Sequence, residues 1–299
     1  MDILRLMKVF VAVADELGFA AAGRRLNMSP PAVTRAVSQL EDHLGVRLLN
    51  RSTRHVRPTD AGLVYCADAR RIIEDVATSE ASAAGVSTRP TGLLSVTAPV
   101  LFGQMFVVPT ITRYLQTYPD VSVDAVFLDR VVNLLEEDLD VGVRIGELPD
   151  SSMRAIRVGS VKVVSCAAPA YLAKHGIPTR LTDLKDHFLI SSKAINTTSE
   201  WRFFDNNKLQ SIKVTPRLIT TSNAAAIEAA RAGLGITRLI SYQVARCIND
   251  GTLKTVLENF EASTLPIHIL HREGRLTTAK VRCFIDMLVD DLRSDKNLN

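Results

Sequence analysis

The chain has 299 residues, of which 46% are hydrophobic and 23% charged, and its formal net charge at neutral pH is +4. This length predicts about two domains of an ordinary globular protein. No apolar run is long enough to cross a bilayer, and the first residues lack a signal-peptide pattern, so a membrane protein is excluded. The four cysteines (Cys66, Cys166, Cys247 and Cys283) show no CxxC or Cys/His metal spacing. We therefore expect a cytoplasmic protein without a metal site.

The start of the chain predicts three helices in close succession. An amphipathic helix is expected over residues 3–17, and two shorter helical patterns follow at 20–26 and 30–44. Residues 27–29 separate the last two, and their asparagine tolerates the left-handed conformation that a tight corner needs. The serine of this corner is expected to cap the next helix, with Pro30 at its first position. The pattern predicts a helix-turn-helix.

One face of the helix at 30–44 is apolar, whereas the other carries hydrogen-bonding side chains and an arginine. Such a helix can enter a major groove and read base edges. The candidate DNA-contacting residues here are Ser29, Pro30, Pro31, Thr34, Arg35, Ser38 and Gln39. Charge favours DNA binding over a merely solvated hairpin, because residues 20–57 hold seven arginines against two acids, while the whole chain carries only +4.

A basic ribbon follows at residues 51–57. Short and extended, it predicts a wing that grips the DNA backbone through Arg51, Arg54 and Arg57. Such contacts position a protein on DNA without reading its sequence. The DNA-binding domain is accordingly expected to span residues 1–58.

A long helix is expected over residues 59–86, with Thr59 as its N-cap. Its apolar stripe has heptad-like spacing and is formed by Tyr65, Ala69, Ile72, Val76 and Ala83. A stripe this long exceeds what a wing and three short helices can bury. We therefore expect it to pair with a second copy in a dimer, which also supplies the two recognition helices of a twofold site. Packing against the C-terminal domain is the alternative.

Residues 87–91 form a polar hinge, and strands alternate with helices beyond it. Strands are expected at 93–98, 121–128, 141–145, 158–166, 188–191, 214–220 and 265–271. Helices are expected at 102–118, 131–138, 224–232, 241–250 and 277–293. This alternation predicts an α/β fold with mainly parallel sheets and a ligand site at the carboxyl ends of the strands.

The chain resembles a LysR-type transcriptional regulator from residue 3 to about residue 292. In the first domain the likeness is carried by FAAAGRRLNMSPPAVTRAVSQLEDHLGVRLLNR (19–51) and RPTDAG (57–62). In the second it is carried by TGLLSVTAP (91–99), DVGVRIGELPDSS (140–152), PAYLAKHGIP (169–178) and AGLGI (232–236). The resemblance implies an N-terminal winged helix-turn-helix with a long linker helix, and then a two-lobed α/β effector domain like a periplasmic binding protein.

The resemblance further implies that the chain crosses between the lobes near residues 160–163 and 263–267. Lobe I is then 92–161 and 267–292, and lobe II is 162–266. By analogy and by position at strand ends, the effector-binding residues are Pro99, Val100, Leu101, Phe102, Ile145, Gly146, Ser191, Ser192, Thr221, Asn223 and Thr237. A turn or helix cap is the alternative role for each serine and threonine, and Asn223 is expected to cap the helix at 224–232.

Four positions depart from the family pattern. Pro30 stands where relatives often have a glutamine, and Ala20 replaces a Ser/Thr cap. Gly23 replaces a common alanine and is expected to loosen its short helix. Leu101 stands where many relatives carry a Ser or Thr, so an anion-binding role of this loop would rest on backbone N–H groups. The apolar loop favours a small, partly apolar effector, with a carboxylate as one option.

Two other functions remain for a DNA-binding chain. A nucleoid-type structural DNA binder would explain residues 1–86 but not the remainder. A thiol-redox-sensing regulator would need Cys166 and Cys247, which both have the pattern of buried small apolar residues. An enzyme is not indicated, because no phosphate loop, nucleophile elbow or metal constellation of the six histidines is present, and no cofactor is expected.

The expected partners are double-stranded DNA with a twofold-symmetric operator, a small-molecule effector and a second copy of the chain. The family resemblance suggests a homotetramer built from two dimers. RNA polymerase is left open as a further partner, and no membrane contact is expected.

Overall fold

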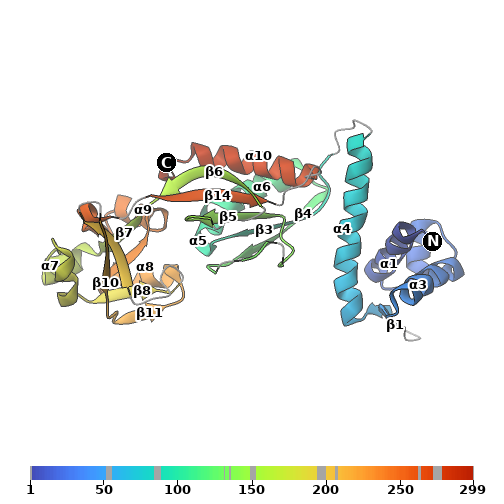
Figure 1. Cartoon of the computed structure of the whole chain (residues 1–299), viewed down its shortest axis with the longest axis horizontal. Coiled ribbons are helices and arrows are strands. Elements are labelled where there is room, and N and C mark those ends of the chain that lie inside the picture. The colour runs from blue at the N-terminus through green and yellow to red at the C-terminus, as the bar shows by residue number, and fades with distance from the viewer. Residues whose placement is uncertain are drawn as a thin grey trace. The chain divides into compact units, whose positions relative to one another are not determined.

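Figure 1 shows the computed structural model of the chain. It describes residues 2–51, 56–83, 89–130, 132–134, 136–148, 153–193, 200–205, 208–261, 264–271 and 278–298, except the side chains of residues 51, 74, 75, 78, 79 and 81–83. The chain divides into two compact units, Met1–Thr88 and Arg89–Asn299. Each has hydrophobic core clusters of its own, and each is described by itself.

The first unit combines helices with a small two-stranded sheet. Its elements are α1 (Ile3–Glu16), α2 (Phe19–Leu26), α3 (Pro30–Leu44), β1 (Leu49–Arg51), β2 (Val56–Pro58) and α4 (Asp60–Ala83). The core side chains Phe10, Val13, Val33, Val37 and Leu40 are completely buried, because spacings of three and four residues put them on one side of α1 and α3. β1 and β2 pair antiparallel as the wing. The predicted winged helix-turn-helix is confirmed.

The corner between α2 and α3 depends on a left-handed residue and a close backbone approach. Asn27 has φ 52°, as expected, and the N–H of Met28 donates to the Gly23 carbonyl at 2.8 Å. A Cβ on Gly23 would lie 2.7 Å from the Met28 oxygen. Gly23 was expected to loosen α2, but its missing side chain is what lets the corner close. Ser29 is the N-cap residue of α3, as predicted, although its side chain makes no capping hydrogen bond.

The backbone at Leu48 joins the wing to two helices. Oε1 of Glu41 on α3 accepts from the N–H groups of Leu48 and Leu49 at 2.9 and 3.0 Å. The Leu48 carbonyl accepts from Thr59 N–H at 2.9 Å. Thr59 also caps α4, as predicted, because its Oγ1 accepts from Gly62 N–H at 2.9 Å. A Cβ on Gly62 would lie only 1.9 Å from the Leu48 oxygen, so glycine is required at this crossing.

In the second unit, the first lobe is built on a five-stranded sheet of order β4-β3-β5-β14-β6. Its strands are β3 (Gly92–Ala98), β4 (Val121–Phe127), β5 (Val141–Ile145), β6 (Arg154–Val161) and β14 (Leu265–His271). The helical segments are α5 (Val100–Phe102), a π-helical turn (Gly103–Val107), α6 (Val108–Thr117), α10 (Ala279–Ser294) and a 3-10 turn (Lys296–Leu298). Figure 1 shows α10 running along this lobe beside β6 and β14.

The second lobe is built on another five-stranded sheet, of order β11-β8-β12-β7-β13. Its strands are β7 (Val163–Ala167), β8 (Leu189–Ser192), β11 (Leu218–Thr220), β12 (Ile236–Ile240) and β13 (Lys254–Val256), and β9 (Glu200–Asp205) pairs with β10 (Lys208–Lys213) as a separate hairpin. Its helical segments are α7 (Pro169–His175), α8 (Asn223–Arg231), α9 (Ser241–Asn249) and the 3-10 turns Leu181–Asp186 and Glu258–Phe260.

The chain passes between the lobes at Lys162, since β6 ends at Val161 in one sheet and β7 begins at Val163 in the other. The single strand predicted over 158–166 is therefore wrong. The sheets are also mixed rather than mainly parallel. β3 is parallel to β4 and β5, whereas β14 returns from the second lobe and runs antiparallel to β5 and β6.

Three further features of this unit differ from the sequence analysis. The short helix predicted over 131–138 is replaced, in its described residues, by hydrogen-bonded turns. The helix predicted over 102–118 contains the π-helical turn, because Pro109 has no N–H for a regular helical bond. The β9–β10 hairpin was not predicted, although it buries Trp201 and Phe203. Within the described residues, no helix combines the length and apolar character needed to span a membrane.

Candidate DNA-binding surface and effector pocket

The solvent-facing side of α3 carries the predicted base-reading residues. Pro31, Arg35 and Gln39 are exposed at intervals of four residues, with Thr34 and Ser38 half-buried beside them. The hydroxyl of Thr34 donates to the Pro30 carbonyl at 3.0 Å. Ser29 and Pro30 are exposed at the start of the helix. The candidate residues of α3 thus share the face opposite its buried side, as a major-groove helix requires.

The arginines of the first unit are not equally available to DNA. Arg35 and Arg57 are exposed. Arg25 instead donates to Asp15 and Glu16 at 3.1 and 3.4 Å, so part of the positive charge counted from the sequence is neutralised within the unit. Of the other two wing arginines, Arg51 is described through its backbone alone, and Arg54 lies outside the described residues.

The predicted dimer stripe of α4 divides into two parts. Ala69 is completely buried within its own chain, and the Tyr65 ring packs on Phe10 at 5.7 Å between centroids. Both side chains pack on the winged helix-turn-helix of their own chain, because the start of α4 packs on α1. Ile72 is 38% exposed and Val76 is half-buried, so the middle of the stripe is accessible, whereas the Ala83 side chain lies outside the described residues. Leu63 and Val64 add exposed apolar surface elsewhere on the helix.

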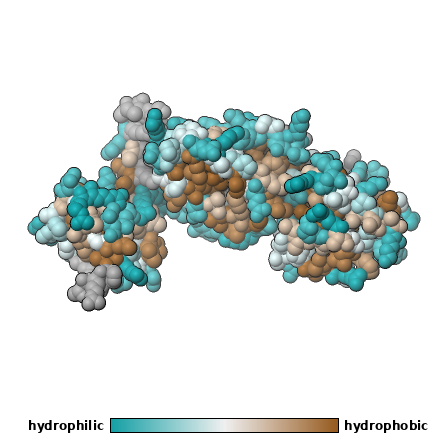
Figure 2. Space-filling model, turned by 180° about the vertical axis from the view of Figure 1, so that it is seen from behind, coloured by the Kyte–Doolittle hydropathy of each residue, from teal (hydrophilic) through white to brown (hydrophobic). Residues whose placement is uncertain are grey.

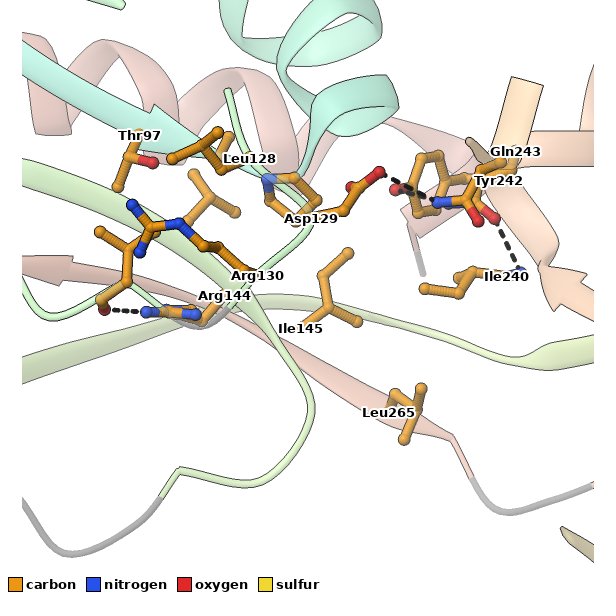
Figure 3. Close-up of a pocket in the computed structure, with 15 residues that line it drawn as sticks. Thr97, Leu128, Asp129, Arg130, Arg144, Ile145, Ile240, Tyr242, Gln243 and Leu265 are labelled. Atoms are coloured by element: carbon orange, nitrogen blue, oxygen red, sulfur yellow. Dashed lines mark hydrogen bonds between the residues drawn. The ribbon is translucent and has the colours of Figure 1, made fainter. Parts of the chain in front are cut away.

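A pocket of about 250 Å³ lies between the lobes of the second unit (Figure 3). Of the predicted effector residues, Pro99, Ile145 and Asn223 line it. The lining residues that the sequence analysis missed are Thr97, Ala98, Leu128, Asp129, Arg130, Val132, Val143, Arg144, Ile240, Tyr242, Gln243 and Leu265. Asp129 and Arg130 lie two and three residues after the end of β4, so their position near a strand end could have identified them.

The other eight predicted effector residues do not line this pocket. They are Val100, Leu101, Phe102, Gly146, Ser191, Ser192, Thr221 and Thr237. Phe102 is completely buried in the first lobe's core, and the Thr237 hydroxyl donates a hydrogen bond to the Ile190 carbonyl at 3.3 Å. Thr221 is exposed at the surface. A position near a strand end did not decide whether these side chains point into the pocket or into a core.

Asp129 connects the loop after β3 to the second lobe. Its Oδ1 accepts from the Val100 N–H at 3.0 Å, and its Oδ2 accepts from Asn223 Nδ2 at 3.4 Å. The predicted capping role of Asn223 belongs instead to Ser222, whose Oγ accepts from Ala225 N–H at 3.3 Å. Asn223 is 3% exposed, and its Oδ1 is buried without a hydrogen-bond donor among the described residues.

Two arginines form the opposite end of the pocket. Arg130 makes a bidentate pair with Glu137 at 2.6 and 2.8 Å. Arg144 donates to the Val132 carbonyl, and no described carboxylate lies within ion-pair distance of it. Burial lowers the pKa of the Arg144 guanidinium, although Glu137 partly offsets this effect. Figure 3 shows both arginines on the side of the pocket away from Tyr242 and Gln243.

Tyr242 anchors the second lobe in the core of the first. Its ring packs edge-on against Phe102 and Phe106, with centroids 5.3 and 5.7 Å away. Burial raises the pKa of Tyr242 far above its usual range, and the Asp129 carboxylate adds to the rise. Gln243 donates to the Tyr242 hydroxyl at 3.3 Å and accepts from the Ile240 N–H at 3.1 Å.

The cysteines of the second lobe have the environment of core residues. Cys166 is completely buried, and burial raises the pKa of its thiol to about 12. Cys247 is half-buried and packs against the same hydrophobic cluster. A thiol this far from ionising is a poor nucleophile toward peroxide. The described residues also contain no group of three or more His, Cys, Asp or Glu side chains arranged to hold a metal ion.

Known proteins share both units of this chain. The family model for bacterial regulatory helix-turn-helix proteins of the lysR family matches residues 4–63, and that for the LysR substrate binding domain matches residues 87–293. The HTH-type transcriptional regulator CrgA of Neisseria meningitidis is 30% identical over 287 residues, which cover 96% of each chain. The HTH-type transcriptional activator AaeR of Escherichia coli is 31% identical over 292 residues, covering 97% of this chain and 94% of its own.

Solved structures agree with these matches. The structure of CrgA, described as a LysR-type transcriptional regulator, gives a TM-score of 0.62 at 30% identity over 96% of this chain and 98% of that one. A full-length variant of AphB, 24% identical, also gives a TM-score of 0.62 and supports the fold. With both units matched, the chain belongs to the LysR-type transcriptional regulators and joins a helix-turn-helix to an effector-binding domain.

Proposed function

We propose that the protein binds a twofold-symmetric operator as a homodimer, with one α3 helix in each half-site. Thr34, Arg35, Ser38 and Gln39 read base edges, and the residues before them contact the backbone at the helix start. The wing arginines Arg51, Arg54 and Arg57 hold the flanking phosphates. The observation that carries this assignment is the exposed polar face of α3, on which Arg35 and Gln39 lie one helical turn apart.

The dimer forms through the accessible part of α4. Among the stripe residues whose side chains are described, Ile72 and Val76 remain accessible to a partner, because Tyr65 and Ala69 pack within the chain. Apolar surface on the first lobe, gathered in the middle of Figure 2, offers a second contact for a tetramer, and Leu93, Met105 and Val108 are exposed in this lobe. The protein acts in the cytoplasm, where its operator lies, and RNA polymerase is a candidate partner there.

A small molecule in the interlobe pocket controls DNA binding. Both lobes line the pocket, so a bound molecule has different contacts in open and closed arrangements and shifts their populations. A coupling of about 1–3 kcal/mol is enough for regulation. Redox control through Cys166 and Cys247 is disfavoured by the burial of the Cys166 thiol and its high pKa.

Thermal unfolding of the full chain with a panel of metabolites tests this control, because a ligand stabilises the folded state by mass action. A metabolite that raises the melting temperature should also change operator binding. Asn223→Leu should abolish the shift, while Ile177→Ala, at an exposed position outside the pocket, should leave it intact. A shift that persists in Asn223→Leu would place the effector elsewhere.

A further inference from the structure

The polar groups of the interlobe pocket are separated by charge, and this separation defines a ligand class. Asp129 is hydrogen-bonded to Asn223. Figure 3 shows Arg130 and Arg144 on one side of Asp129, and Tyr242 and Gln243 on its other side. Ile145 lies below Asp129 and beside Arg144 in the same view. A ligand that matches this arrangement has opposite charges at its two ends.

The chain's own carboxylate already occupies the start of the helix after β3. Asp129 Oδ1 accepts from the Val100 N–H at 3.0 Å, and the residue before it, Pro99, has no N–H to offer. A ligand carboxylate at this position would meet the charge of Asp129 at close range. These backbone N–H groups were expected to bind an anionic effector. The Asp129 carboxylate takes that place instead, because it accepts the Val100 N–H.

The Asp129 end presents hydrogen-bond acceptors. Asn223 Nδ2 donates to Asp129 Oδ2 at 3.4 Å, which fixes the orientation of the amide, since the reversed amide would set two acceptors against each other. The Asn223 Oδ1 is then left buried without a donor among the described residues. A carboxylate and an amide oxygen together suit an ammonium group, which has three N–H donors and no acceptor.

The arginine end has the opposite character. Glu137 engages Arg130 through both of its oxygens, so it serves as the counter-ion of that arginine. Among the described residues, Arg144 donates one hydrogen bond, to the Val132 carbonyl. Its planar guanidinium has five N–H donors in all. The remaining donors can take a carboxylate in bidentate geometry.

We propose that the pocket binds a small amino carboxylate, with its ammonium group between Asp129 and Asn223 and its carboxylate on Arg144. The pocket volume of about 250 Å³ restricts the ligand to a small molecule. Closing the two lobes around it satisfies the buried Asn223 oxygen, which gives the ligand its preference for the closed arrangement. This inference rests on the proposed effector control of the same pocket.

Calorimetric titration of the full chain tests the proposal with unbranched amino carboxylates from glycine to 6-aminohexanoate. Each probe is compared with the carboxylate and the amine of equal chain length, for example 4-aminobutyrate with butyrate and butylamine. One length of amino carboxylate should bind at least about tenfold tighter than either single-function analogue, because each end adds a charge-assisted hydrogen bond. Equal affinities, or no binding by any probe, would overturn the proposal.

Two variants test the ends separately. Asp129→Asn keeps an oxygen for the Val100 N–H but removes the negative charge. The variant should therefore bind the amino carboxylate about as weakly as the carboxylate analogue of equal length. Arg144→Gln should likewise bind the amino carboxylate about as weakly as the amine analogue. Asp120→Asn and Arg157→Gln, at exposed sites in the same lobe, serve as matched controls. An amino carboxylate that binds Asp129→Asn as tightly as wild type would contradict the assignment.

Operator binding by the same preparations separates this inference from the proposed function. Intact operator binding without any preference for amino carboxylates would overturn the ligand class alone. A wild-type chain that binds no operator would overturn the proposed function itself.

Discussion

The polar face of α3 comes from one continuous segment, Pro30–Leu44, whereas the effector pocket takes its lining from six stretches of chain between Thr97 and Leu265. The first surface is set by helical periodicity alone. The second exists only after two sheets have formed and the chain has passed between them twice. A local pattern can therefore predict the exposed polar face of α3, while the pocket depends on which strand-end side chains turn inward.

The largest effect is expected on the stability of the first unit, at the close contact between Gly62 and Leu48. Gly62→Ala should destabilise the first unit by about 3 kcal/mol or more, because the added Cβ clashes with the Leu48 carbonyl oxygen. Only a shift of the backbone would relieve this clash. Operator binding should fall with it, since Leu48 joins the wing to α3. Denaturant unfolding measures the change, and Ala67→Ser, at an exposed site on α4, is the control. An unchanged unfolding midpoint would show that the helix crossing adapts.

The next effect concerns assembly. Ile72→Glu should convert dimers to monomers at micromolar concentration, because it places a charge in the accessible part of the α4 stripe. Sedimentation velocity gives the mass, and Ile177→Glu adds the same charge at an exposed site on the second lobe as a control. Dimers that survive Ile72→Glu with full operator affinity would move the interface to the effector unit.

A smaller effect is expected at the base-reading face. Arg35→Ala should weaken operator binding by about 1–3 kcal/mol and relax the preference at one base position. Arg25→Ala should cost less than about 1 kcal/mol, because Arg25 is engaged by Asp15 and Glu16 at an exposed site. Binding titrations with a set of operator variants measure both. A larger loss for Arg25 than for Arg35 would reverse the assignment of the two helices.

The smallest effect is expected from oxidation. Burial raises the pKa of the Cys166 thiol to about 12, so very little reactive thiolate is present at pH 7 and peroxide should leave operator binding unchanged. Mass spectrometry after alkylation would detect a disulfide between Cys166 and Cys247. Formation of that disulfide together with altered operator binding would favour thiol sensing over effector control.

Much of the fold could be predicted because its signals are local. Val33, Val37 and Leu40 follow helical spacing along α3. Asn27 and Thr59 mark a corner and a cap that the structure confirms. The single strand predicted over 158–166 failed for a different reason. Strand-forming residues lie on both sides of Lys162, and their pattern does not show that β6 and β7 join different sheets.

The pocket was predicted only in part because its chemistry comes from pairs of distant residues. Asn223 was identified, but its partner Asp129 lies 94 positions earlier in the chain. Arg144 was passed over although its neighbour Ile145 was identified, because a position at the end of β5 does not show which side chains turn into a cavity. Leu101 and Phe102 were chosen as pocket residues, yet both pack into hydrophobic cores.

Hydroxyl-radical footprinting of the full chain on a selected operator tests the central claim most directly. A dimer that reads DNA with two α3 helices should protect two half-sites related by a dyad, with centres separated by a whole number of helical turns. Arg35→Ala should relax the same base position in both half-sites. Uniform protection that follows protein concentration and ignores sequence would contradict the account and indicate a structural DNA-coating protein.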